Sequence, residues 1–402
     1  MIRRFAAAAL LSLLIASVPA SCAKRTPPQT APTVPTPPPA TLPVAAPPPA
    51  PLTIPASLSD ADFWGLVTDF SEPNGTFRSD NLLSNEIWLQ SVIPELIAIA
   101  PPGRVYLGVG PEQNFTYIAA LKPAMAFIVD VRRGNLDLHL MYKALFELSA
   151  DRAEFVSRLF ARKRPEGLSS SSTVQELFAA FANVESSEAL FSENLKAMLD
   201  HLSNTHGFAL GQEDVQGIEY VYRNFQTYGP GLTYWMSGRG GGFGRNSPSY
   251  ADLMLSTDES GQPRSYLASE ENFVLLKTLE SQNLLVPIVG NFAGPKAIRA
   301  VAAYLKERHA IVSAFYLSNV EQYLNMDSLW PAFCANVATL PVDTTSRFIR
   351  SVRAGQYGYG PGLSSTLGVI VDDIKSCVSQ SETHTQPDPH LIDLIRIPRV
   401  QR

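Results

Sequence analysis

The sequence has few cysteines and no concentrated block of positive charge. Three of its 402 residues are cysteine, and 32 Lys and Arg stand against 37 Asp and Glu, a formal net charge of −5. Because nucleic-acid binding needs a basic patch or stripe, we expect no nucleic-acid partner. Beyond the N-terminal leader no run of about 18 apolar residues occurs, so no spanning helix is predicted there.

Several catalytic signatures are also missing. The chain contains no HExxH, CxxC, GxSxG or Walker sequence, so the reactions that these motifs mark have no local support. His201 and His206 are five residues apart, a spacing that does not place two ligands on one face of an α-helix. No metal site is therefore predicted.

The N-terminus has the three parts of an export signal. Residues 1–4 are positive, residues 5–18 are apolar, and small residues lead to Cys22. Two processing sites remain open. Cleavage before Cys22 would lipidate this cysteine and anchor the protein to a membrane, whereas cleavage after Ala20 would leave it a free thiol. We predict a signal peptide over residues 1–22 and an exported protein of the cell envelope or periplasm.

Proline dominates the next segment, residues 23–56. Thirteen of the 32 prolines lie between Pro27 and Pro55, without a single charged residue. Proline fixes φ and removes an amide donor, which predicts a linker, either a semi-rigid spacer or an ordinary disordered terminus. A globular domain over residues 57–377 and a polar tail over residues 378–402 are expected to follow.

The most informative pattern begins at Arg104. An apolar strand over residues 104–110 leads through glycines into a short helix, and a second strand over 126–130 ends in an acid. A helix over 135–148 follows. Strand, glycine turn, helix and strand form the βαβ unit of a doubly wound sheet.

Other segments complete the expected fold. Residues 81–100 read as a helix, and residues 151–217 read as an inserted helical subdomain. The later alternation comprises helices over 268–281 and 295–309 and strands over 284–289 and 311–317. The predicted fold is therefore α/β, with a mostly parallel, Rossmann-like sheet.

Three features of the βαβ unit predict a cofactor site. Gly108 and Gly110 would let the backbone approach a ligand, and the helix after Asn114 would offer free amides. Asp130, 22 residues after Gly108, would accept hydrogen bonds from a ribose. The predicted cofactor-binding residues are Gly108, Gly110, Glu112, Asn114, Asp130 and Arg132.

Glu112 bears on the kind of cofactor, because it occupies the region of the third glycine of a dinucleotide fingerprint. A carboxylate there would repel a pyrophosphate, which argues against NAD and FAD. Over residues 104–133 the chain resembles class I S-adenosylmethionine-dependent methyltransferases, in which spaced glycines follow the first strand and an acid ends the second. The resemblance implies S-adenosylmethionine, which has a ribose but no phosphate. Tyr106 stands where those enzymes usually carry an acid.

A longer resemblance is to an uncharacterised family of bacterial proteins with a methyltransferase-like fold. The segments that carry it are residues 108–115, 127–135, 139–143 and 315–321. This resemblance implies the fold for most of the globular part and offers no established reaction.

Further candidates follow from their positions along helices and strands. Asn135, His139 and Lys143 recur every four residues and share one helix face, which either lines the site or is solvated. Glu112, His139 and Lys143 are the candidate acids or bases. The substrate candidates are Asn135, Asn291, Phe292, Ser318 and Asn319, of which the Ser318-Asn319 pair also suits a helix cap.

The predicted export affects which function we favour. Cys334 and Cys377 would form a disulfide in an oxidising compartment or remain two buried thiols. S-adenosylmethionine is a cytoplasmic cofactor, and a chain threaded unfolded across a membrane would arrive without it. We therefore favour an exported, ligand-binding envelope protein of undefined activity. The alternatives are a methyltransferase that acts on a small molecule or an envelope component, and another transferase or hydrolase on the same scaffold.

Overall fold

The computed structural model describes residues 54–236, 247–353 and 362–383. The predicted signal peptide with Cys22, the linker up to residue 53 and the tail beyond residue 383 lie outside the described residues. The described residues all belong to a single compact unit. None of its helices is both long and apolar enough to cross a membrane.

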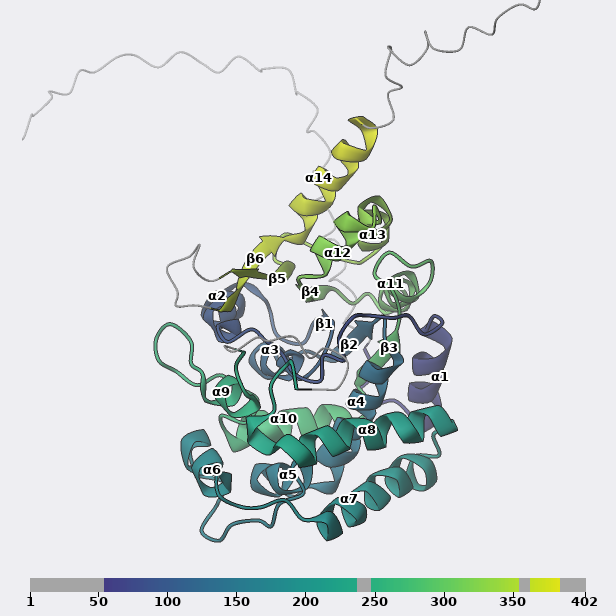
Figure 1. Ribbon diagram of the computed structural model, residues 1–402. Coiled ribbons are helices and arrows are strands. Elements are labelled where there is room, and N and C mark those ends of the chain that lie inside the picture. The colour runs from purple at the N-terminus through teal and green to yellow at the C-terminus, as the bar shows by residue number, and fades with distance from the viewer. Residues whose placement is uncertain (1–53, 237–246, 354–361, 384–402) are drawn as a thin grey trace, which may run out of the picture. The chain divides into compact units, whose positions relative to one another are not determined.

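A sheet of six described strands lies at the centre, in the order β3-β2-β1-β4-β5-β6 (Figure 1). The strands are β1 (Val105–Gly108), β2 (Met125–Asp130), β3 (Leu285–Val289), β4 (Val312–Ser318), β5 (Arg347–Arg353) and β6 (Leu363–Val369). The first five run parallel, and β6 is antiparallel to β5. The order of the strands reverses between β1 and β4, and ligands of open α/β sheets bind at such a point.

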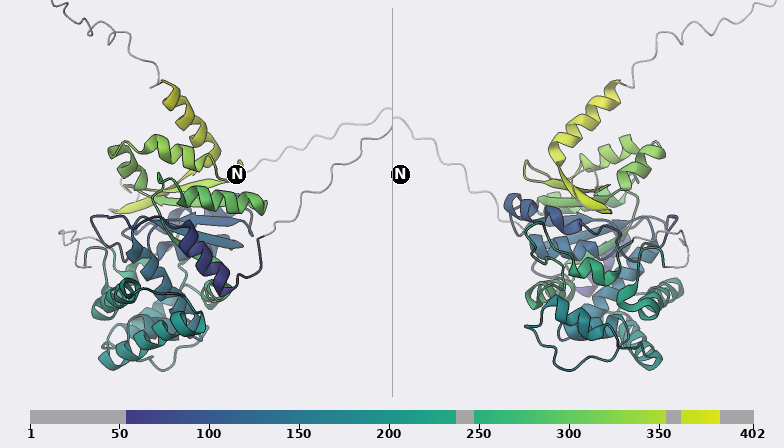
Figure 2. Two further views of the ribbon diagram at one scale, coloured as in Figure 1. Left: turned by 90° about the vertical axis from the view of Figure 1, so that its right-hand side faces the viewer. Right: turned by 60° about the vertical axis from the view of Figure 1, so that its left-hand side comes forward.

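Helices cover both faces of the sheet (Figure 2). One face carries α3 (Gln113–Leu121), α4 (Arg133–Leu148) and α10 (Glu270–Ser281), which pack against one another. The other face carries α11 (Ala297–Glu307) and α13 (Trp330–Val337), and α1 (Asp60–Phe70) packs along β3 and α11. Because β1, β2 and β3 are buried on both sides, their sequences are apolar runs rather than alternating ones, apart from Asp130 at the end of β2.

A further layer of helices packs beneath α4 (Figure 1). It contains α5 (Arg152–Leu159), α6 (Val174–Phe181), α7 (Glu188–Asp200), the π-helical turn η2 (His201–Thr205), α8 (Gln212–Tyr228), the 3-10 turn η3 (Gly229–Gly231) and α9 (Tyr250–Leu255). Helices thus continue past residue 217, where the sequence predicted the end of an inserted subdomain. Whether this layer is a separate subdomain remains a prediction.

The helix predicted over residues 81–100 is wrong in its first half. The 3-10 turn η1 (Leu89–Val92) and α2 (Ile93–Ile99) are helical, whereas residues 71–88 run in an irregular course across the carboxyl ends of the strands. We call residues 71–88 the strap. Leu82 and Leu83, which gave the helical pattern, are buried by this course instead.

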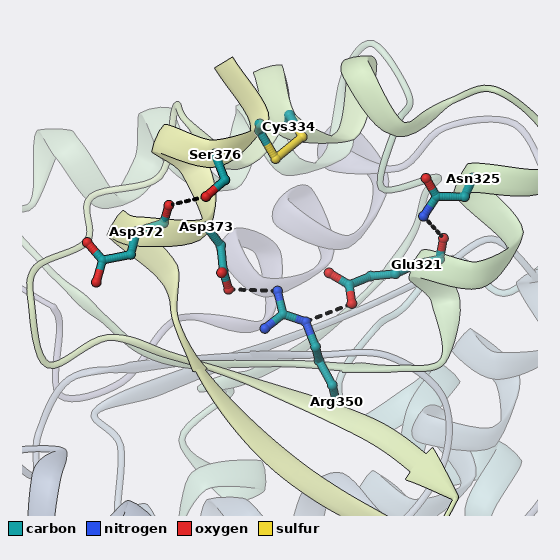
Figure 3. The surroundings of a disulfide bond; sticks show 8 residues. Glu321, Asn325, Cys334, Arg350, Asp372, Asp373 and Ser376 are labelled. Atoms are coloured by element: carbon teal, nitrogen blue, oxygen red, sulfur yellow. Dashed lines mark hydrogen bonds and ion pairs between the residues drawn. A yellow bond between two sulfur atoms is a disulfide. The ribbon is translucent and has the colours of Figure 1, made fainter. Parts of the chain in front are cut away.

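The C-terminal part of the unit is tied together covalently. Cys334 of α13 and Cys377 of α14 (Ile370–Thr383) form a disulfide (Figure 3). Beside it, Arg350 of β5 donates to Glu321 of α12 (Val320–Met326) at 2.7 Å and to Asp373 of α14 at 2.8 Å. The bridge answers the question that the sequence left open, and α14 extends past residue 377, where the tail was expected to begin.

Candidate functional site

A cavity of about 180 Å³ lies at the carboxyl ends of β1 to β4, where the strand order reverses. The loops after β2, β3 and β4 and the strap all contribute to its wall. Six of the predicted residues meet there, namely Asp130, Arg132, Asn291, Phe292, Ser318 and Asn319. Their role in binding remains a prediction, but the structure brings them together.

Asp130 and Arg132 form a nearly buried ion pair in this wall. Asp130 Oδ1 accepts from the backbone amide of Arg132 at 2.9 Å and from its Nε at 3.0 Å, and Oδ2 accepts from Nη2 at 2.8 Å. Arg132 also donates to the carbonyl oxygen of Asp80 in the strap. The two charges neutralise each other. A carboxylate oxygen accepts about two hydrogen bonds, so Oδ2, which accepts one from Arg132, can accept another.

The side chain of Asn114 occupies the inside of the glycine turn, where a ligand was expected. Asn114 Nδ2 donates to the carbonyl oxygens of residues 109–111, at 3.0, 3.2 and 2.7 Å, and its Oδ1 accepts from the Tyr106 hydroxyl at 2.9 Å. A Cβ on Gly108 would lie 1.9 Å from Asn114 Oδ1, and Gly110 has a φ of +76°. Both glycines are therefore required by a turn that closes around Asn114. Tyr106 anchors this turn, and neither it nor Gly108, Gly110 or Asn114 lines the cavity.

Glu112 is fully enclosed next to this turn. Its Oε1 accepts from the backbone amide of Ser84 in the strap at 3.2 Å, and no hydrogen bond reaches its Oε2. Burial raises the pKa of Glu112 to about 8, so the side chain is a neutral acid at neutral pH. The negative charge that was expected to repel a pyrophosphate is thus absent at neutral pH. Glu112 also does not line the cavity.

The predicted face of α4 is neither solvated nor part of the cavity wall. Asn135, His139 and Lys143 are all buried. His139 Nε2 lies 2.9 Å from the Gly110 carbonyl oxygen, and burial lowers the pKa of His139 to about 4, so a neutral ring donates this bond. Lys143 Nζ donates to Glu147, to the Glu280 carbonyl and to Asn283. These side chains hold the interior together.

The first acid of the strap, Glu72, caps a helix on the far side of the cavity. Its Oε1 accepts from the amides of Lys296 at 2.8 Å and Ala297 at 2.9 Å, and its Oε2 accepts from the amide of Asn291 at 3.0 Å. The start of a helix is a natural place for a phosphate because free amides converge there. At the start of α11 this place is taken by the protein's own carboxylate.

Another acid of the strap, Glu86, ties the strap to the other half of the sheet. It is buried and accepts from the hydroxyls of Tyr316, Ser318 at 2.9 Å and Ser365 at 3.3 Å. Burial raises the pKa of Glu86, and these hydroxyls oppose the rise. The roles of Glu72 and Glu86 were not predicted from the sequence, because no local pattern in residues 71–88 points to their distant partners.

Two aromatic rings complete the cavity wall. Phe77 of the strap and Tyr323 of α12 meet edge to face, with ring centroids 5.0 Å apart and an interplanar angle of 83°. Arg78 donates to the Tyr323 hydroxyl. Both rings are partly exposed. They form an apolar wall that the sequence analysis also missed, because it arises from segments about 245 positions apart.

Comparison with known protein families gives a match over most of the chain. A family model described as "Domain of unknown function (DUF7790)" matches residues 82–229 and 241–389. No curated protein matches the chain. The match agrees with the expected uncharacterised family and supplies no reaction, so the methyltransferase resemblance remains a prediction.

Proposed function

The chain belongs to the family described as "Domain of unknown function (DUF7790)", and we propose its function from the cavity at the strand reversal. We infer that its Rossmann-like domain binds a small, uncharged ligand that has a planar ring and neighbouring hydroxyl groups, the chemistry of a nucleoside. The observation that carries this proposal is the make-up of the cavity wall, in which a neutralised ion pair faces two aromatic rings.

The charges around the cavity favour a ligand without phosphate. Among the described residues that line it, Arg132 is the only base and its charge is matched by Asp130, while the exposed Asp327 adds a further negative charge. The amides at the start of α11 are already bonded to Glu72. A phosphate would find no free cation and no free helix terminus in this wall, whereas an uncharged ring would stack on Phe77 and Tyr323.

The polar groups of the wall suit hydroxyl recognition. Asp130 Oδ2 keeps one acceptor position, and the amide side chain of Asn319 and the hydroxyl of Ser318 lie in the same lining. A ligand with adjacent hydroxyls can use such groups, as a ribose does at the end of the second strand of a Rossmann fold.

The test is calorimetric titration of the full chain with adenosine and with AMP. Adenosine is expected to bind and AMP to bind at least about tenfold more weakly. Tyr323→Leu, which removes one ring of the wall, should weaken adenosine binding by about 1–3 kcal/mol, since stacking on an aromatic ring contributes about that much. Tyr228→Leu, at an exposed tyrosine of α8, is the matched control. Equal affinities for adenosine and AMP, or no effect of Tyr323→Leu, would contradict the proposal.

A methyltransferase is the second candidate, and the place of Asp130 favours it. Asp130 ends β2 and faces the cavity, as the acid of the S-adenosylmethionine site does in the resemblance described above. The same titration with S-adenosylmethionine and S-adenosylhomocysteine decides between the two candidates. Binding that Asp130→Asn weakens would support a methyltransferase, and binding of adenosine alone would oppose it.

We further propose that the protein is exported. The disulfide between Cys334 and Cys377 supports an oxidising compartment, because thiols in the cytoplasm are kept reduced. In a bacterial host with thiols blocked at lysis, the full chain should reach the envelope fraction with this bridge formed. A chain that begins at residue 58 should remain cytoplasmic and reduced. Fatty-acid labelling that Cys22→Ser abolishes would identify a lipid anchor, and a full chain with free thiols in the cytoplasm would refute export.

A further inference from the structure

Three potential metal ligands converge outside the cavity, beneath the sheet. Glu147 lies near the end of α4. His201 is the first residue of the π-helical turn η2, and His206 directly follows this turn. The Nε2 atoms of both histidines lie 2.6 Å from the same oxygen, Glu147 Oε2. The three ligand atoms are all within 4.8 Å of one another.

The π-helical turn explains why the sequence analysis overlooked this cluster. In an α-helix, residues five apart point in different directions, and on that ground His201 and His206 were not expected to share a site. Here the His206 amide donates to the His201 carbonyl oxygen at 3.0 Å, the i to i+5 bond of a π-helix. This wider turn brings both rings to one side, with centroids 4.7 Å apart.

A second layer of contacts fixes the orientation of these ligands. His206 Nδ1 lies 2.6 Å from Asp60 Oδ1, at the start of α1, so its Nε2 is turned toward Glu147. Lys143 Nζ lies 2.8 Å from the other oxygen of Glu147, Oε1, and leaves Oε2 facing the histidines. Metal-binding histidines commonly have a carboxylate behind the ring in this way, and such partners fix the tautomer and direction of the ligand.

We propose that Glu147, His201 and His206 bind a divalent transition-metal ion, with Zn²⁺ the best match. Two imidazoles and one carboxylate are a ligand set that Zn²⁺ uses when it keeps a fourth position open. The three side chains are 7–19% exposed, so an ion can enter while most of the site is shielded. The 2.6 Å distances are those of hydrogen bonds between each ring and Glu147 Oε2, and a bound ion would replace both bonds. The ion would join η2 to α4, with α1 behind His206.

The test uses the full chain after treatment with a chelator, and Zn²⁺ alone is the probe. Competition with a chromogenic chelator should give one ion per chain. The double variant His201→Gln and His206→Gln should bind Zn²⁺ at least about 100-fold more weakly, and Asp60→Asn about 10-fold to 100-fold more weakly, the usual effect of losing a partner behind a ligand. The matched control is His309→Asn, because His309 is exposed and has a φ of +51°, a conformation that asparagine tolerates.

The outcomes are distinct. Zn²⁺ that binds equally well to the native chain and to the double variant would overturn the proposal and assign the ion to other histidines, such as those of the tail. A loss of affinity in His309→Asn as large as in the double variant would also overturn it. If the double variant does not fold, as circular dichroism would reveal, Co²⁺ added to the native chain decides. Visible absorption bands of a four-coordinate Co²⁺ site would support the proposal, and their absence would refute it.

Discussion

At the scale of single residues, burial holds two ionisable side chains uncharged on either side of the glycine turn. Glu112 is kept protonated and His139 is kept neutral, with pKa values moved in opposite directions. Both residues were predicted as acids or bases of a reaction. Their surroundings instead make them parts of the interior that joins the turn to the strap and to α4.

Glu112 should make the folded state less stable as the pH rises. Between its ordinary pKa of 4.5 and its folded value of about 8, the folded chain keeps a proton that the unfolded chain releases. Glu112→Gln removes this titration and keeps an oxygen for the Ser84 amide. Urea denaturation at pH 5 and at pH 8 gives the drop in the free energy of unfolding between these two pH values. This drop should therefore be smaller in Glu112→Gln than in the native chain by a few kcal/mol, because each pH unit contributes about 1.4 kcal/mol.

Glu219→Gln is the matched control for this prediction, because Glu219 lies exposed on α8. Its pH dependence should match that of the native chain. If the curves of Glu112→Gln and the native chain run parallel between pH 5 and pH 8, Glu112 titrates normally in the folded state.

At the scale of elements, the strap is held by Glu72 and Glu86 rather than by a regular backbone pattern. Glu72 bonds to the loop before α11, and Glu86 bonds to β4 and β6. The helix that the sequence predicts over residues 81–100 fails in this segment for that reason. Leu82, Leu83 and Ile87 have the spacing of a helix, but the bonds of Glu72 and the buried Glu86 hold the backbone across the sheet, and these tertiary bonds override the local pattern.

Removing one of these acids should release the strap. Glu86→Ala leaves hydroxyls of Tyr316, Ser318 and Ser365 without their acceptor, and a buried group that loses its partner costs about 1–3 kcal/mol. Stability to urea should fall by about 3 kcal/mol or more, and the amides of residues 71–88 should exchange with deuterium faster than those of β1 and β2. Glu95→Ala, at an exposed acid of α2, is the control. Unchanged exchange in the strap would show that Glu86 does not hold it.

At the scale of the whole molecule, the sequence was most informative where local pattern and burial agree. The strand, turn, helix and strand between residues 104 and 130 were predicted because β1 and β2 are uninterrupted apolar runs, and strands buried on both faces have such sequences. β3 and β4 were predicted for the same reason and α11 from its helical pattern, each with small errors at its ends.

The other half of the sheet could not be predicted in this way. β5 contains Arg347, Arg350 and Arg353, and nothing local shows that Arg350 is matched by Glu321 and Asp373. β6 contains Ser364 and Ser365; the Ser365 hydroxyl bonds to Glu86 and Tyr117, and the Ser364 hydroxyl bonds to Ser91. The cavity was predicted in part, since residues that end strands fall together at one edge. Its aromatic rings come from segments that only the finished fold brings together.

The course of the strap also sets the order in which the molecule can be completed. Glu86 and its partner Ser365 are 279 residues apart in the chain. At a synthesis rate of about 5–20 residues per second, the strap leaves the ribosome roughly 14 to 56 seconds before that last partner exists. For that time Glu86 has only Tyr316 and Ser318, once they are made, among the hydroxyl partners described above. The strap is therefore made early in synthesis but can complete its contacts only after β6 has been made.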